Sequence, residues 1–207
     1  MLRILGKASS INVRKVLWTC AELGLTPERE DVSSGFAPTG TPEFLALNPN
    51  RLVPVLLDEA GVLWESNAIC RYLANKAGRT DLLPARPRGR AVVEQWMDWQ
   101  ATELNPSWRA AFLGLVRRDP AHAEPSRIAA AVRGWNAAMA ILEGRLAQTG
   151  AYAAGETFTL ADIVLGLSVN RWRMTPMERP DCPAIAAYHD RLLTRPGYRE
   201  HGANGIP

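Results

Sequence analysis

Apolar residues in the first third of the chain alternate between short strand-like runs and segments with helical spacing. The pattern predicts strands over 2–5 and around 28–32, with helices over 12–23 and from residue 42. Gly24 is placed to end the first helix, and Thr41 followed by Pro42 is a typical start for the second. The Gly- and Pro-rich segment 33–42 between them is expected to be a loop.

Two further apolar runs, Val53–Leu57 and Val62–Trp64, flank the turn-forming residues 58–61 and predict a hairpin. Pro54 lies inside the first run, where it removes a ladder hydrogen bond, so it belongs at an edge, a bulge or a strand start. A cis Val53-Pro54 bond would leave the Val53 backbone free to pair with an extended peptide.

The second run ends at Glu65 and is followed by a predicted helix with apolar residues at Ile69, Tyr72 and Leu73. Ser66 is a suitable N-cap, and the free N–H groups behind it suit a carboxylate ligand. The order strand, helix, strand, helix, strand, strand, helix predicts a thioredoxin-like α/β domain over residues 1–79.

Everything beyond a Pro-containing linker at residues 80–88 is expected to be helical, giving an all-α bundle domain over residues 89–207. Helical spacing predicts helices over 91–116, 125–147, 159–175 and 183–193. Thr159 and Asp162 form the sequence signature of a capping box, which fixes where a buried helix begins. We assign this motif a structural role.

Composition indicates a globular protein that acts in the cytoplasm. The net charge is only +3, from 24 basic and 21 acidic residues, which argues against a nucleic-acid partner. No apolar run is long enough to cross a membrane or serve as a signal sequence, so no membrane partner is expected. Cys20, Cys70 and Cys182 are far apart and resemble reduced core thiols, and no metal-ligand cluster is visible.

Candidate chemistry lies at the first strand-to-helix turn, which runs from Ser9 to Lys15. A dithiol redox protein needs an attacking and a resolving cysteine at this turn, whereas the chain carries Ser9, Ser10 and Asn12. A hydroxyl and an amide at a helix N-terminus can each donate a hydrogen bond to a thiolate, and the helix dipole adds to their effect. From the residues alone, Ser10 is equally well explained as an N-cap and Asn12 as a turn residue.

The segments 48–56 and 63–73 resemble the glutathione-binding half of the cytosolic glutathione transferases. Segments 94–100 and 159–162 are similar to the helical domain of bacterial members, so the resemblance covers essentially the whole chain. Residues 10–15 map onto Thr-Pro-Asn-Gly-x-Lys of the bacterial disulfide-bond reductase group, and theta, delta and zeta members also carry a serine here. No tyrosine lies nearby, which excludes the tyrosine-dependent kinds.

The resemblance implies roles for the residues of a glutathione site. Ser10 would activate the thiol and Asn12 would be a second donor, with Ser9 as the alternative if the register slips by one. The tripeptide would lie against Arg51, Leu52, Val53, Pro54, Glu65, Ser66 and Asn67. Within this set Val53 would pair with the cysteinyl unit, and Glu65 with Ser66 would hold the γ-glutamyl group. Arg51 would face the glycyl carboxylate or solvent.

A second substrate is expected between the two domains. The residues that would line its site are Ala8, Trp108, Arg109, Phe112 and Trp172, although aromatic residues at helical spacing also occur in cores. Apolar pockets of this kind accept many electrophiles.

These inferences predict a glutathione transferase of the detoxification type that transfers alkyl or aryl groups. Glutathione would be the co-substrate, a small hydrophobic electrophile the partner substrate, and peroxide or disulfide reduction a further activity. The resemblance also implies a homodimer. Two alternatives stay open: a non-catalytic glutathione-binding stress-response module, and a glutathione-dependent disulfide reductase, lyase or isomerase.

Overall fold

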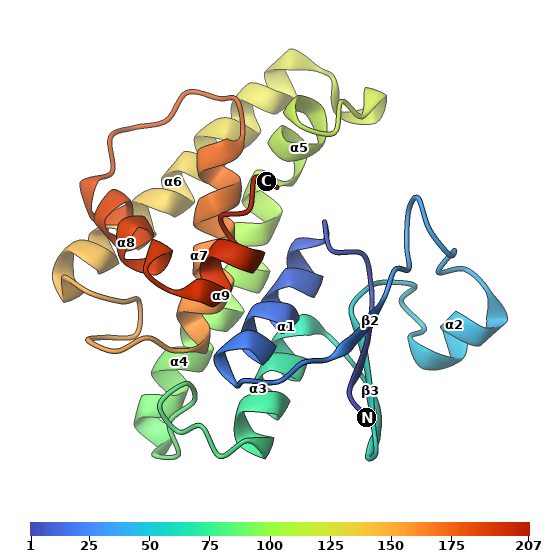
Figure 1. The fold of residues 1–207 in the computed structure, drawn as a ribbon. Coiled ribbons are helices and arrows are strands. Elements are labelled where there is room, and N and C mark those ends of the chain that lie inside the picture. The colour runs from blue at the N-terminus through green and yellow to red at the C-terminus, as the bar shows by residue number, and fades with distance from the viewer.

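The computed structural model describes all 207 residues, and a small mixed β-sheet organises the first third of them (Figure 1). Its strands are β1 (Arg3–Leu5), β2 (Glu28–Glu30), β3 (Val55–Asp58) and β4 (Gly61–Trp64), in the order β2-β1-β3-β4. The β1–β2 pair is parallel, and the other two pairs are antiparallel. With the helices between them, these strands form the predicted thioredoxin-like layer.

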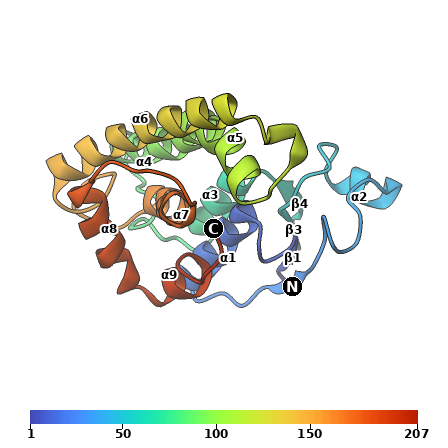
Figure 2. The ribbon, with the colours of Figure 1, turned by 90° about the horizontal axis from the view of Figure 1, so that it is seen from above.

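Helices α1 (Ile11–Glu22) and α3 (Ser66–Lys76) lie between the sheet and the C-terminal helices, while α2 (Pro42–Leu47) projects away from them (Figures 1 and 2). The expected N-cap at Thr41 is confirmed, because its hydroxyl accepts the Phe44 N–H at 3.3 Å. The expected N-cap at Ser66 is wrong. Glu65 is the N-cap, with a left-handed φ of 71°, and Ser66 is the first helical residue.

The remaining elements are helical, as predicted. They are α4 (Pro87–Trp99), the π-helical turn η1 (Gln100–Leu104), α5 (Asn105–Leu115), the 3-10 turn η2 (Pro120–His122), α6 (Pro125–Thr149), α7 (Leu160–Met174), α8 (Pro183–Leu193) and α9 (Pro196–His201). The sequence pattern did not reveal α9. None of the helices has the combination of length and apolarity needed to cross a bilayer.

The single helix expected over 91–116 is interrupted by η1, and Pro106 supplies the reason. Proline has no N–H and its ring clashes with the carbonyl four residues earlier, which here belongs to Thr102 in the middle of η1. The wider π turn relieves this clash without ending the helix. The π turn thus joins α4 to α5, which packs against α6.

Helix α7 is the centre of the helical part and is surrounded by other helices (Figure 2). Every residue from Leu160 to Trp172 is buried. A helix that is buried on all sides has no polar face, so amphipathicity does not determine where it begins. Polar contacts fix its first turn instead. Asp162 accepts the Thr159 N–H at 2.8 Å, and this confirms the predicted capping box.

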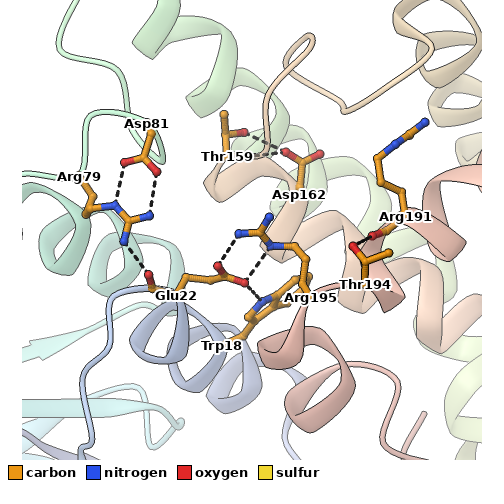
Figure 3. Close-up of polar contacts among 9 residues, drawn as sticks. All are labelled: Trp18, Glu22, Arg79, Asp81, Thr159, Asp162, Arg191, Thr194 and Arg195. Atoms are coloured by element: carbon orange, nitrogen blue, oxygen red, sulfur yellow. Dashed lines mark hydrogen bonds and ion pairs between the residues drawn. The ribbon is translucent and has the colours of Figure 1, made fainter.

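Trp18 on α1 joins the sheet-containing part to the helices. It is fully buried, with its ring 4.9 Å from that of Tyr198 and 5.7 Å from that of Phe158. Gly197 is required here, because a Cβ on it would lie 2.6 Å from Trp18 Cδ1. Beside this contact Glu22 receives two hydrogen bonds from Arg195, which precedes α9 (Figure 3).

We propose that the segment 77–86, between α3 and α4, joins two domains, in keeping with the division expected at residues 80–88. The core does not divide at this point. One cluster of 37 buried residues includes side chains from α1 and α3 as well as from α4 to α9. The two units are therefore held in one fixed arrangement, and a site between them has rigid walls.

Candidate active site

A cavity of about 580 Å³ lies between the first strand-to-helix turn and helix α5. Its size is within the usual range for small-molecule sites. The sheet-containing part and the helical part of the chain each supply nine of its residues: Lys7, Ser9, Ser10, Ile11, Asn12, Ser33, Arg51, Leu52 and Val53 from the first part, and Ala101, Asn105, Pro106, Trp108, Arg109, Phe112, Leu113, Arg117 and Arg171 from the second. The sequence predicted nine of these 18 residues.

Ser9, Ser10 and Asn12 lie together on the cavity wall at the N-terminus of α1. The backbone of Ser10 is fixed on both sides, because its N–H donates to Lys7 O at 3.0 Å and its carbonyl accepts the Arg14 N–H at 2.9 Å. Its hydroxyl makes no capping hydrogen bond. The Ser10 hydroxyl is thus held in position and left without a protein partner, as a donor to a ligand must be.

Val53 reaches the same cavity from the loop before β3. The Val53-Pro54 bond is cis, and the Val53 backbone pairs with no other protein group. Gly6 permits this approach, because a Cβ on it would lie 2.5 Å from a Val13 methyl and 3.0 Å from Val53 Cβ. The absence of a side chain at Gly6 therefore lets the Val53 loop close onto the start of α1.

Glu65 and Ser66 lie next to Val53 and Pro54 through the hairpin. The β3–β4 ladder ends with Val55 opposite Trp64, so Pro54 and Glu65 are the residues that adjoin this last pair. Glu65 is exposed and its side chain makes no capping hydrogen bond, while the Ser66 N–H is in the unpaired first turn of α3. Neither residue, nor Pro54, belongs to the 18 that line the cavity, so they extend the site along the sheet.

Asn67, which the resemblance assigned to glutathione, points into the protein. Its amide donates to Met97 O at 2.9 Å, and its oxygen accepts a 3.4 Å hydrogen bond from the buried Lys15 Nζ. Lys15 also donates to Gln100 Oε1 at 2.7 Å. The Asn67 side chain therefore joins α3 to α4 and lies outside the cavity. Burial in this network lowers the Lys15 pKa to about 8.

Three of the five residues expected around a second substrate line the cavity: Trp108, Arg109 and Phe112. Ala8 is exposed and lies outside the lining. Trp172 is also outside it, because its indole is buried and donates to Asn136 Oδ1 at 2.8 Å. Successive residues on an α-helix point about 100° apart. This rotation turns the neighbouring residue, Arg171, to the cavity in place of Trp172.

Sequence reasoning missed the second-half cations Arg117 and Arg171 and the π-turn neighbours Asn105 and Pro106. Pro106 within a helical pattern was a usable signal for a break near the site. Arg171 had no such signal, since an isolated arginine on a helix is normally at the surface. In the structure Arg171 is only 4% exposed.

The remaining chemistry-bearing groups are excluded from the cavity. Cys20, Cys70 and Cys182 are free and buried, and none lines it. Burial raises the pKa of the Cys20 thiol to about 12 and that of Cys70 to about 11. The structure contains no group of three or more His, Cys, Asp or Glu side chains arranged to hold a metal ion. Nucleophilic chemistry by a cysteine of the chain is therefore not supported.

Comparison with known proteins agrees with the site and the fold. Residues 9–76 match the family model described as Glutathione S-transferase, N-terminal domain, and residues 125–191 match its C-terminal domain. The chain is 34% identical over 202 residues to Glutathione S-transferase GstB of Escherichia coli K12, with 97% of each chain covered. The chain belongs to the glutathione S-transferase family.

Solved structures of glutathione transferases are similar to this chain over nearly its whole length. A theta class glutathione S-transferase from Xanthomonas axonopodis pv. citri with glutathione bound is 39% identical, with a TM-score of 0.93 covering 100% of this chain and 99% of that one. A delta-class glutathione transferase from Nilaparvata lugens is 26% identical, with a TM-score of 0.87 covering 100% and 95%. The family and fold predicted from the sequence are confirmed.

Proposed function

We propose that this family member is a glutathione transferase that activates glutathione as its thiolate. The observation that carries the proposal is the unpaired Ser10 hydroxyl at the start of α1, on a cavity whose opposite wall is built by α5. Glutathione would lie along the sheet edge, with its cysteinyl unit on Val53 and its γ-glutamyl group at Glu65 and Ser66. The carboxylate of Glu65 suits the ammonium of that group, and the Ser66 N–H suits its carboxylate.

Ser10 and Asn12 would stabilise the thiolate form of the bound co-substrate. A reference thiol ionises near pH 8.5, so lowering the pKa of a bound thiol by about two units requires roughly 2.7 kcal/mol of anion stabilisation. Two hydrogen bonds to an anion together with the positive end of α1 are sufficient. Stabilising the sulfur anion exposes more nucleophile, whereas tighter binding of the whole tripeptide does not accelerate the chemical step.

The thiolate would attack an electrophile held against the aromatic wall of α5. Trp108 and Phe112 pack edge to face, with ring centres 5.4 Å apart, and both line the cavity. A flat apolar substrate can lie on such a surface. Arg51 is exposed on the opposite side, where it suits the glycyl carboxylate of glutathione.

We also propose that the protein works in the cytoplasm as a homodimer. Three free cysteines suit a reducing compartment. The edge strand β4 leaves two large apolar side chains partly exposed, Val62 at 41% and Trp64 at 38%, and a second copy would bury them. Light scattering of the purified protein distinguishes a dimer of about twice 22.7 kDa from a monomer.

Turnover of glutathione with 1-chloro-2,4-dinitrobenzene tests the proposal. Ser10→Ala should lower kcat/KM about tenfold or more, corresponding to about 1.4 kcal/mol of lost transition-state stabilisation. Ser9→Ala, one residue away on the same wall, should have a much smaller effect. Reversed effects would make Ser9 the thiol-activating group. Glutathione binding without turnover of this or any other electrophile would favour the non-catalytic module.

A further inference from the structure

The charged groups of the cavity wall all have one sign. Five of its 18 residues are cationic and none is acidic; the cations are Lys7, Arg51, Arg109, Arg117 and Arg171. None of the five is within 4 Å of an Asp or Glu carboxylate oxygen. Six arginines elsewhere in the chain do have a carboxylate partner, as Arg195 has in Glu22. The cavity therefore concentrates positive charge that no acidic side chain of the protein neutralises.

Arg171 is the most deeply buried of these cations. Its guanidinium carbon lies 4.5 Å from the centre of the Trp108 ring and 4.1 Å from that of Phe112, so two aromatic faces hold it where a carboxylate is usual. Its only side-chain hydrogen bond is a long one of 3.4 Å to an oxygen of Pro207, the last residue of the sequence, and its Nε has no partner. A buried guanidinium with unused N–H groups is costly unless an anion completes it.

Neighbouring cations increase this demand for an anion. Arg14 is 1% exposed, and its terminal N–H groups donate to the Ile206 carbonyl at 2.8 Å and to an oxygen of Pro207 at 2.9 Å. Arg117 lies two residues beyond the end of α5, with its guanidinium 5.6 Å from the Phe112 ring centre. Burial, together with the charges of Arg14 and Arg117, lowers the Arg171 pKa to about 9. An anion in this part of the cavity would relieve the repulsion among the three guanidinium groups.

Glutathione alone does not account for all five cations. Its thiolate form carries two carboxylates, one thiolate and one ammonium, which leaves two net negative charges. Lys7 and Arg51 come from the same half of the chain as Ser10 and Val53, where glutathione is proposed to lie. Arg109 comes from α5, Arg117 from the turn that follows it and Arg171 from α7, all beside the aromatic wall proposed for the electrophile. These three are left for the second substrate.

We propose that the second substrate is an aromatic electrophile that carries a carboxylate, held by Arg109, Arg117 and Arg171 with its ring on the α5 wall. This inference rests on the proposed transferase function and names its substrate class. With an aryl chloride, the thiolate sulfur forms a bond to the ring carbon, and the carbon–chlorine bond breaks. Chloride leaves with the bonding electron pair, and the proton lost by the glutathione thiol goes to solvent.

A matched pair of substrates tests the proposal: 4-chloro-3,5-dinitrobenzoate and the corresponding neutral benzamide. For each, kcat/KM is divided by the uncatalysed rate constant with glutathione, which removes the difference in intrinsic reactivity. The wild type should favour the carboxylate about tenfold or more, as expected for a charge-assisted contact. The preference should shrink as salt is raised from about 0.05 to 0.5 M.

Arginine variants locate the effect. Arg109→Gln and Arg117→Gln change exposed side chains, so both should fold, and each should reduce the preference about threefold or more. Arg133→Gln on α6 is the matched control, because Arg133 is exposed and lies outside the cavity lining. Inhibition by 3,5-dinitrobenzoate, which has no leaving group, should weaken in the two cavity variants and stay unchanged in the control.

Three results would overturn the proposal. One is that the wild type turns over both substrates with nearly equal corrected kcat/KM values, a result that would still support the transferase function. Another is that Arg109→Gln and Arg117→Gln weaken the binding of glutathione but leave the binding of the carboxylate substrate unchanged. The third is a lack of turnover of either substrate although bound glutathione is ionised. Failure to bind or ionise glutathione at all would instead contradict the proposed function on which this inference rests.

Discussion

The Lys15 ammonium on α1 donates a 2.7 Å hydrogen bond to the side-chain oxygen of Gln100, the first residue of the π turn. Gln100 in turn donates to Asn105 Oδ1 at 2.8 Å, and the Trp108 indole donates to the same oxygen at 3.1 Å. This chain of contacts runs from the helix that begins at Ser10 to the aromatic wall of the cavity. It links the two halves of the candidate site through the buried side chains of Lys15 and Gln100 and the partly buried ones of Asn105 and Trp108.

Lys15 should make the free energy of unfolding depend on pH. Its folded pKa is lowered from 10.5 to about 8, mainly by burial, so between those values the unfolded chain holds a proton that the folded protein has released. Stability therefore rises with pH across this window, by an amount on the order of 3 kcal/mol for this group. Urea unfolding of the wild type and Lys15→Met at pH 7.5, 9 and 10.5 measures the difference. A difference that does not change with pH would show that the lysine is not desolvated.

The Glu22–Arg195 pair should stabilise the contact between α1 and the C-terminal helices. The Glu22 carboxylate is only 10% exposed and also accepts the Trp18 indole N–H at 2.8 Å (Figure 3). Glu22→Gln keeps an acceptor for Trp18 but loses the ion pair, at an expected cost of about 1–2 kcal/mol. Asp81→Asn is the control, because the Arg79–Asp81 pair is 36% and 58% exposed and should change stability by no more than about 0.5 kcal/mol. Equal costs in the two variants would contradict this distinction.

The Asp162 carboxylate should be among the most sensitive positions for stability. It accepts hydrogen bonds from the N–H and hydroxyl of Thr159, from the Ala153 N–H and from the Tyr188 hydroxyl, and all are buried. Asp162→Asn keeps one acceptor oxygen and places an NH₂ against donors, so a loss of about 2–3 kcal/mol is expected. Thr159→Val removes a single donor and should cost about 1 kcal/mol. Thermal unfolding measures both, and a larger effect of Thr159→Val would contradict the central role of the carboxylate.

Glu65→Gln should weaken glutathione binding more than it affects the chemical step. The variant keeps the size of the side chain but removes the negative charge that we assign to the γ-glutamyl ammonium. An increase in the dissociation constant of about tenfold, or 1.4 kcal/mol, is expected from calorimetry, with kcat nearly unchanged. Glu59→Gln, on the exposed hairpin turn, is the matched control. An unchanged affinity in Glu65→Gln would remove Glu65 from the site.

The fold was predictable because local signals and hydrophobic periodicity agree over most of the chain. Ser10, Thr41 and Thr159 precede helices, and the turn between Val55–Asp58 and Gly61–Trp64 carries the residues that a hairpin needs. The π turn was not predicted, because it depends on how Pro106 is accommodated within a packed bundle. Helix α9 was also missed, because six residues carry little periodicity.

The site was predictable where its groups come from consecutive residues and less so where tertiary packing decides. Ser9, Ser10, Asn12 and Val53 line one cavity as expected. Asn67 points inward because the buried Lys15 requires a hydrogen-bond acceptor. Arg171 faces the cavity instead of Trp172, because successive residues of α7 point in different directions. Such choices depend on neighbours that are distant in the sequence, which periodicity does not encode.

The ionisation of bound glutathione tests the central claim most directly, because it requires no assumption about the electrophile. The thiolate absorbance in the ultraviolet is titrated against pH for glutathione bound to the wild type, Ser10→Ala and Asn12→Ala. We expect the bound thiol to ionise about two units below its reference pKa of 8.5 in the wild type, and to return toward 8.5 in Ser10→Ala. Binding of glutathione with an unshifted thiol pKa in the wild type would contradict the account.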